Sequence, residues 1–288
     1  LGTSAVEAAQ STADINWERE SLAFRKNFPD PKNIVIERDV PGQPHKGKVL
    51  ALIFAHADDH AGTGTAAKLI NEGYTGYLIR VTNEDKTSSG TVGEAVELIA
   101  DDTENVGKAI GCTKTYNLGY NKHDLEDISI QELRARFIFL FRLLQVDTVI
   151  TFDPWSHYEE NPDHYWTGRA VEAATWHSTK ITRDYPEHSS AGLRGHGVRE
   201  KYYFYRGPDL VNYTYTECNR IVDISSTIEK KINADIANKS WGLGSRNPEA
   251  IRKRLTGDEQ PNPWGVPMST LTKRFGLKYA EFFHHMGG

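Results

Sequence analysis

The chain has 288 residues, of which 38% are hydrophobic, so it is long enough to bury one sizeable core. Its formal net charge is −5 and it contains no long run of Lys or Arg, which argues against nucleic acid or an anionic membrane surface as a partner. No window reaches about 18 consecutive apolar residues, so the sequence predicts no transmembrane segment.

The first part of the chain is polar and rich in proline. Residues 1–46 are expected to form an N-terminal arm, and residues 47–288 a single domain. The chain begins "LGTSAVEAAQSTAD", whose small residues are typical of what remains after an export signal is removed. We therefore expect an exported protein, periplasmic or extracellular, with a cytoplasmic location as the alternative.

Regular patterns begin at residue 48. The apolar run "KVLALIFAH" (48–56) predicts a buried strand, and "TAAKLINEGY" (65–74) predicts a helix that ends at Gly73. "TGYLIRVTN" (75–83) predicts the next strand. A helix is expected over residues 93–110, followed by a strand in "TKTYNLGY" (113–120).

The second half of the chain continues the alternation. Ser129 and Glu132 have the spacing of a capping box at the start of a helix, and "DTVITFDP" (147–154) predicts a buried strand. Residues 179–207 are expected to be a long insertion before the last strand and helix. Alternating strands and helices predict an α/β fold, a Rossmann-like and mostly parallel sheet with helices on both faces, in one domain with loop insertions.

The end of the first strand, "LIFAHADDH" (52–60), could serve three kinds of site. Residues 62–67, "GTGTAA", approximate a dinucleotide-binding fingerprint. Asp58 and Asp59 would then face a pyrophosphate, and like charges about 4 Å apart repel by about 4 kcal/mol at a dielectric constant of 20. Glycines that ease the turn from strand to helix are the better interpretation.

A metal site is the second interpretation. His56 and Asp59 follow the first strand, and Asp163-His164 follow the fourth, so that both pairs reach the carboxyl edge of a parallel sheet. Two histidines and one carboxylate with an open position form a hydrolytic zinc arrangement. The alternative for Asp58 or Asp59 is to cap the following helix. A third, minor interpretation uses His56, Asp58 and His164 as the ligands of a non-haem Fe(II) oxygenase.

These motifs resemble those of the LmbE/PIG-L family of zinc-dependent N-deacetylases. "AHADDH" (55–60) is similar to the family's Ala-His-Pro-Asp-Asp-Glu, and "NPDH" (161–164) to its His-Pro-Asp-His. "LIRVTNED" (78–85), "VDISSTIEKKINADIANKSW" (222–241) and "KYAEFF" (278–283) resemble later family segments. The resemblance covers roughly residues 48–283.

The resemblance implies a role for each residue at the site. His56, Asp59 and His164 would bind zinc or another divalent ion, and Asp58 would be the general base that takes a proton from metal-bound water. Asn161 replaces the family's first histidine of the second motif, which stabilises the reaction intermediate. An asparagine can donate a hydrogen bond but carries no charge, so the stabilisation would be weaker or come from elsewhere, for example from His157.

Further departures concern supporting positions: His60 replaces a Glu, Asn238 a His, and Lys122 an Asp. The resemblance implies a metal-dependent hydrolase that removes the N-acetyl group from an N-acetylated amino sugar or glycoconjugate. Asn161 keeps open an alternative, a catalytically degenerate member that binds a glycan without turnover.

Overall fold

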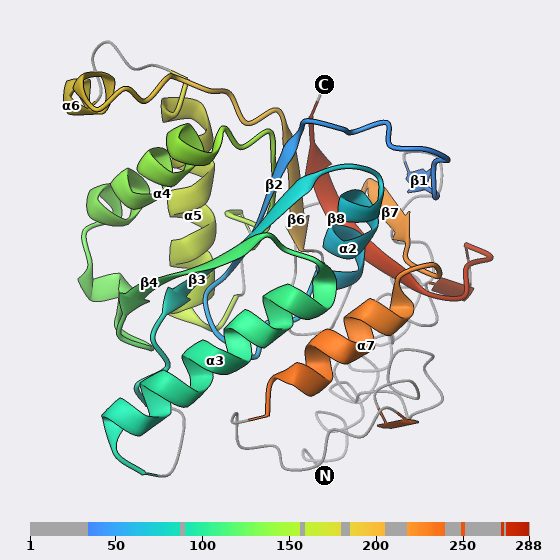
Figure 1. Cartoon of the computed structure of the whole chain (residues 1–288), viewed down its shortest axis with the longest axis horizontal. Coiled ribbons are helices and arrows are strands. Elements are labelled where there is room, and N and C mark those ends of the chain that lie inside the picture. The colour runs from blue at the N-terminus through green and yellow to red at the C-terminus, as the bar shows by residue number, and fades with distance from the viewer. Residues whose placement is uncertain are drawn as a thin grey trace, which may run out of the picture.

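The computed structural model describes residues 34–86, 90–155, 159–179, 185–204, 218–239, 249–250, 272–273 and 275–287. Within these residues, one eight-stranded sheet has the order β1-β7-β8-β6-β5-β2-β3-β4 (Figure 1). The strands are β1 (Val35–Glu37), β2 (Val49–Phe54), β3 (Thr75–Thr82), β4 (Lys114–Tyr120), β5 (Thr148–Thr151), β6 (Glu200–Phe204), β7 (Arg220–Asp223) and β8 (Ala280–Met286). Every pairing is parallel except those of β8 with β6 and β7.

Helices cover both faces of this sheet. They are α2 (Thr63–Asn71), α3 (Val92–Ile110), α4 (Ile130–Leu144), α5 (Pro162–His177), α6 (Pro186–Ser190) and α7 (Ile228–Ala237), with a 3-10 turn, η2 (Leu125–Asp127). Helices α2, α3 and α7 pack on one face, and α4 and α5 on the other (Figure 1). The predicted α/β fold with helices on both faces is confirmed.

Alternation along the central strands explains why two cores form. In β2, Leu50, Leu52 and Phe54 face the core with α2 and α7, while Ala51 and Ile53 face the core with α4 and α5. Successive side chains of a strand point to opposite faces, so a strand buried on both faces is apolar throughout. This is the physical basis of the continuous apolar run in the sequence.

The chain reverses its direction of travel across the sheet at β2. From β2 it proceeds through β3 to β4 on one side, and then returns to place β5 on the other side of β2. The two strands pair in parallel, with Leu50 opposite Thr148 and Leu52 opposite Ile150. Loops that leave the carboxyl ends of β2 and β5 therefore diverge, and such a switch point is where ligands bind in open parallel sheets.

Three details differ from the sequence predictions. The expected insertion at 179–207 contains β6, which is an inner strand between β5 and β8. Part of the expected N-terminal arm, Val35–Glu37, is an edge strand, and residues 1–33 of the arm lie outside the described residues. The capping box predicted at Ser129 is absent because the Ser129 hydroxyl contacts Gln131 Oε1 (2.6 Å) and Glu132 accepts from the Tyr120 hydroxyl (3.1 Å).

A capping box does form elsewhere, at Thr91 and Glu94, where both reciprocal hydrogen bonds are present at the start of α3. Among the described helices, none combines the length and the apolar character needed to cross a membrane.

Candidate metal centre and active site

The three predicted metal ligands lie together at the carboxyl edge of the sheet. His56 and Asp59 are in the turn between β2 and α2, and His164 is in the first turn of α5. His56 Nδ1 is 3.1 Å from His164 Nε2 and 3.9 Å from Asp59 Oδ2. His164 Nε2 is 3.4 Å from Asp59 Oδ1. Both histidines are buried and Asp59 is half-buried. The fold therefore joins residues from two distant segments of the chain in one cluster.

These separations fit a single divalent ion. A tetrahedral zinc site with bonds of about 2.0–2.2 Å places its ligand atoms about 3.3–3.6 Å apart. The observed distances of 3.1, 3.4 and 3.9 Å lie around that value. Two imidazole nitrogens that face each other beside a carboxylate are also a donor set that zinc and several other divalent ions accept.

Each histidine of the cluster turns its second ring nitrogen to a carboxylate. His56 Nε2 lies 2.8 Å from Asp163 Oδ2, and His164 Nδ1 lies 3.2 Å from Glu159 Oε1. Carboxylates behind metal-binding histidines fix the ring orientation and the tautomer. Neither role was predicted, although the sequence carries a signal for both, since Asp163 directly precedes the ligand His164 and Glu159 lies five residues before it.

Asp163 is itself held by the backbone. Its carboxylate accepts hydrogen bonds from the N–H groups of His123 (2.7 Å) and Leu125 (3.2 Å), in the loop after β4. Burial opposes ionisation of Asp163, but the contact with His56 and these two N–H groups outweigh burial and hold the pKa of Asp163 below its ordinary value. An ionised Asp163 can therefore orient His56.

Asp59 does not cap α2, contrary to one alternative from the sequence. The N-cap of α2 is Gly62, at φ 76°, and no side chain caps that helix end. Asp59 Oδ2 instead accepts a hydrogen bond from the His56 backbone N–H (2.7 Å). Burial opposes ionisation of Asp59, yet the neighbouring His164 and His56 lower its pKa, and the same contact with Asp59 raises the pKa of His164 to about 9 against the effect of burial.

Asp58 stands beside the cluster in a different environment. Burial and the charge of Asp59 raise the pKa of Asp58, while Lys122 and His56 oppose that rise. Asp58, His56 and Glu84 also place ligand atoms within 4.8 Å of one another. Glu84 is already paired with Lys122, whose Nζ lies 2.7 Å from Glu84 Oε2. A partly buried carboxyl group with a raised pKa suits proton transfer better than a second metal site.

Asn161 caps α5. Its side-chain oxygen accepts a hydrogen bond from the Asp163 N–H (3.0 Å), and Pro162 occupies the first helical position. The cap uses the oxygen of the amide and leaves its Nδ2 pointing elsewhere. Asn161 therefore lies close to His164 and stabilises the start of α5. His157, which the sequence suggested as its substitute, lies outside the described residues.

The glycine-rich turn cannot hold a dinucleotide phosphate in this arrangement. The Gly64 and Thr65 N–H groups donate to the carboxylate of Glu281 in β8 (3.2 and 2.8 Å). Lys231 of α7 in turn contacts Glu281 Oε1 (2.7 Å). A resident carboxylate therefore occupies the helix N-terminus that would otherwise attract an anion.

One face of α7 supports the turn that carries the ligands. Lys231 Nζ donates to the His60 carbonyl (2.8 Å), and Asn238 Nδ2 donates to the Ala57 carbonyl (2.8 Å). Asp235 Oδ1 lies 3.3 Å from His60 Nδ1. Lys231 and Asp235 share a helix face because they are four positions apart, and Asn238 is the residue that ends the helix. His60 and Asn238 are thus placed as supports of the turn.

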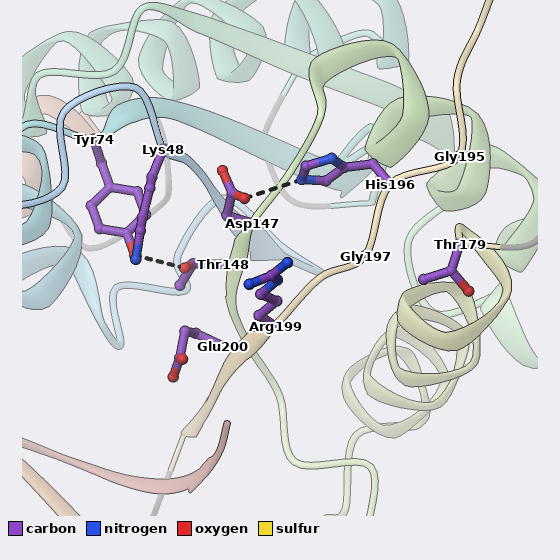
Figure 2. Close-up of a pocket in the computed structure, with 10 residues that line it drawn as sticks. All are labelled: Lys48, Tyr74, Asp147, Thr148, Thr179, Gly195, His196, Gly197, Arg199 and Glu200. Atoms are coloured by element: carbon purple, nitrogen blue, oxygen red, sulfur yellow. Dashed lines mark hydrogen bonds and ion pairs between the residues drawn. The ribbon is translucent and has the colours of Figure 1, made fainter. Parts of the chain in front are cut away.

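The opposite, amino edge of the sheet carries a hollow of about 600 Å³ (Figure 2). Lys48, Asp147, Thr148, His196 and Arg199 are among the residues that line it. His196 Nε2 lies 3.1 Å from Asp147 Oδ1, and the other carboxylate oxygen of Asp147 accepts from the Val49 N–H (2.8 Å). No predicted site residue lines this hollow.

Comparison with known proteins agrees with the motifs. Residues 51–175 match the model of the PIG-L family, described as GlcNAc-PI de-N-acetylase. No curated protein matches the chain. The resemblance to this family that the sequence motifs predicted is confirmed.

Several solved structures have the same fold. The N,N'-diacetylchitobiose deacetylase from Pyrococcus horikoshii is 22% identical over 83% of this chain and 84% of that chain, with a TM-score of 0.66. The 4-carboxy-2-hydroxymuconate hydratase from Pseudomonas putida is 14% identical over 83% and 95%, with a TM-score of 0.59. A zinc-inhibited teicoplanin deacetylase is 12% identical over 84% and 99%, with a TM-score of 0.53. At these identities the likeness establishes the fold, and the fold includes both deacetylases and a hydratase.

Proposed function

We propose, from the match of residues 51–175 to the PIG-L family, that this chain is a metal-dependent hydrolase that removes the N-acetyl group from an N-acetylated amino sugar or glycoconjugate. The observation that carries the proposal is the cluster of His56, Asp59 and His164, whose ligand atoms lie within 4.8 Å of one another. The deacetylases among the similar structures support this choice of reaction.

In this proposal His56, Asp59 and His164 hold the metal, with zinc expected. A divalent ion at that position supplies Lewis-acid activation of water and of the amide carbonyl. Asp163 and Glu159 keep the two imidazoles turned toward the ion by binding their outer nitrogens (2.8 and 3.2 Å). Proton transfer and hydrogen bonding to the substrate are assigned to side chains of the protein.

Asp58 is the proposed general base and acid. It takes one proton from the attacking water as the oxygen bonds to the acetyl carbon, and it then gives that proton to the nitrogen as the carbon–nitrogen bond breaks. The products are acetate and a free amine, which balances the addition of one water. Burial, which raises the pKa of Asp58, favours the protonated form needed for the second step, while Lys122 and His56 favour the ionised form needed for the first.

Asn161 carries two proposed roles. Its oxygen holds the N-terminus of α5, which positions His164, and its Nδ2 remains a hydrogen-bond donor for the substrate. Because a neutral amide stabilises an oxyanion less than a cationic imidazole does, Asn161 also supports the alternative of a glycan-binding protein without turnover.

Acetate release decides between these functions. The metal-loaded protein is incubated with a panel of N-acetylated amino sugars, their oligomers and glycoconjugates. Protein treated with a chelator to remove the metal is the control. We expect acetate and a free amine in equal amounts from the metal-loaded protein alone. Saturable binding of a sugar on the panel without acetate would instead establish the glycan-binding alternative.

The same preparation tests the two other chemistries. Elemental analysis of protein purified without added metal identifies the ion. Iron together with consumption of 2-oxoglutarate would establish the oxygenase interpretation. Because the fold is shared with a hydratase, addition of water to an unsaturated carboxylic acid without acetate release would replace the deacetylase by a lyase.

A further inference from the structure

His123 lies in a hydrogen-bonded loop next to the proposed metal centre. The loop follows β4, and the backbone N–H groups of three of its residues donate to carboxylates. The Lys122 N–H donates to Asp85 Oδ1 (2.8 Å), the His123 N–H to Asp163 Oδ2 (2.7 Å) and the Leu125 N–H to Asp163 Oδ1 (3.2 Å). The position of His123 is therefore tied to the carboxylate that orients His56.

The backbone of His123 is in an uncommon conformation. Its φ is 62°, in the left-handed region that side chains other than glycine rarely adopt. Residues in that region are retained where the surrounding contacts determine them, and they concentrate at functional sites. The hydrogen bond from the His123 N–H to Asp163 is one of the contacts that hold this backbone.

The imidazole of His123 lies edge-on beside that of His56 and is exposed. Its ring centroid is 5.7 Å from that of His56, with the planes at 83°. His56 and His164 are both engaged with carboxylates through their outer nitrogens. Within the described part of the chain, the ring nitrogens of His123 have no hydrogen bond or ion pair. His123 is thus the histidine of this group that can meet a ligand.

A hydrolysis that passes through a tetrahedral intermediate is assisted by a hydrogen-bond donor aimed at the oxygen that gains negative charge. Asn161 is the residue that the sequence places at this position, but its side-chain oxygen caps α5. His123 and Asn161 approach the same residue, Asp163, from two different loops. Both therefore lie beside the residue that orients His56.

We propose that His123 is a catalytic residue of the deacetylation, donating a hydrogen bond from its imidazole N–H to the substrate's acyl oxygen as that oxygen gains negative charge. The inference rests on the proposed function. A neutral imidazole provides one N–H for this purpose, and the carboxylate-bound loop holds it in place before the substrate arrives.

The first test compares two substitutions at one position. Asn suits the left-handed conformation and retains an N–H donor, whereas Ala retains neither the ring nor a donor. We expect His123→Ala to lower kcat by about 10²–10³-fold, as loss of one such donor does elsewhere, with KM nearly unchanged. His123→Asn should recover part of that loss, about tenfold. A rise in KM alone, an unchanged kcat, or loss of bound zinc would each overturn the proposal.

The second test separates His123 from Asn161. Asn161→Ser keeps a side-chain oxygen for the helix cap but removes the amide N–H donor. We expect it to lower kcat less than His123→Ala does. A large loss in Asn161→Ser with none in His123→Ala would assign the donor to Asn161 instead. His157→Ala, carried through the same assay, checks the other histidine considered from the sequence.

Binding of a tetrahedral mimic gives a readout that does not depend on turnover. A phosphonamidate that replaces the acetamide group carries the charge and shape of the intermediate, whereas the acetamide itself does not. His123→Ala should weaken binding of the mimic by about the same factor as kcat and leave binding of the acetamide nearly unchanged. Equal weakening of both would overturn the proposal. Absence of acetate release by the unmodified protein would instead reject the proposed function.

Discussion

The two edges of one sheet differ in what their polar side chains bind. At the carboxyl edge, His56 and His164 face each other at 3.1 Å, and carboxylates lie behind and beside them. At the amino edge, Asp147 beside the hollow in Figure 2 binds His196 and the backbone of β2. At the carboxyl edge the ligand atoms converge on one point, whereas at the amino edge the charged side chains bind neighbouring protein groups.

The difference shows that convergence of ligand atoms is a better sign of a site than a hollow. Several carboxylates held close together repel one another unless a cation lies among them. At the amino edge Glu200 is 2.7 Å from His285 Nε2, and Tyr74 and Thr148 share a hydrogen bond of 2.9 Å. Those residues join strand ends to neighbouring elements, which explains their polarity without a ligand.

Removal of a metal ligand should have the largest effect. His56→Ala or His164→Ala leaves two ligands, so we expect loss of stoichiometric metal and of all acetate release. Elemental analysis after gel filtration measures the first, and a folded circular-dichroism spectrum serves as the control. Retention of one metal ion per chain in both variants would show that the cluster is not the metal centre.

Asp58→Asn should have the next largest effect and separate chemistry from binding. Asn cannot accept a proton, and a general acid–base group contributes about 10²–10⁴-fold to the rate. We expect kcat to fall by that factor while the bound metal stays stoichiometric. If the metal were lost to the same extent as in His56→Ala, Asp58 would be a ligand rather than the base.

Asp163→Asn should produce an intermediate effect at the same edge. The variant keeps the shape of the side chain but weakens the contact with His56 Nε2 (2.8 Å). Loss of such an outer partner costs about 10–100-fold in metal affinity or activity. Competition with a chromophoric chelator measures the affinity. An affinity within about twofold of the unmodified protein would limit Asp163 to holding the loop that carries His123.

His196→Ala at the amino edge should have the smallest effect and is the matched control for the histidine variants. It removes a partly exposed contact with Asp147 (3.1 Å), and such ion pairs contribute about 0–1 kcal/mol. We expect unchanged metal content and unchanged kcat, with a small decrease in the free energy of unfolding by urea. A loss of activity comparable to that of Asp163→Asn would contradict the division between the two edges.

Local sequence patterns determined the central part of the fold. The apolar runs and the helical spacing between residues 48 and 154 correspond to β2, α2, β3, α3, β4, α4 and β5 within a few residues. Strands buried on both faces must be apolar throughout, so their signal is contained in the strand itself. The same reasoning placed His56, Asp59 and His164 at one edge, because parallel strands end on the same side.

Other features were outside the reach of local patterns. The sequence predicts β6 only as part of an insertion, because its five residues have mixed polarity. This segment forms a strand by pairing with β5 and β8. Ser129 and Thr91 each have a Glu three residues later, but of these two only Thr91 forms a capping box. The Ser129 hydroxyl binds Gln131 instead, and Glu132 binds the Tyr120 hydroxyl.

By itself, the sequence determined the alternation of strands and helices between residues 48 and 154 and the three side chains that can bind a metal, because both depend on residue type and spacing. Only the tertiary structure decided what surrounds those side chains. Glu281 binds the first turn of α2 from 217 residues away, and Asp163 joins His56 to His123 across separate loops. Such contacts depend on which elements pack together, and packing is a property of the whole fold.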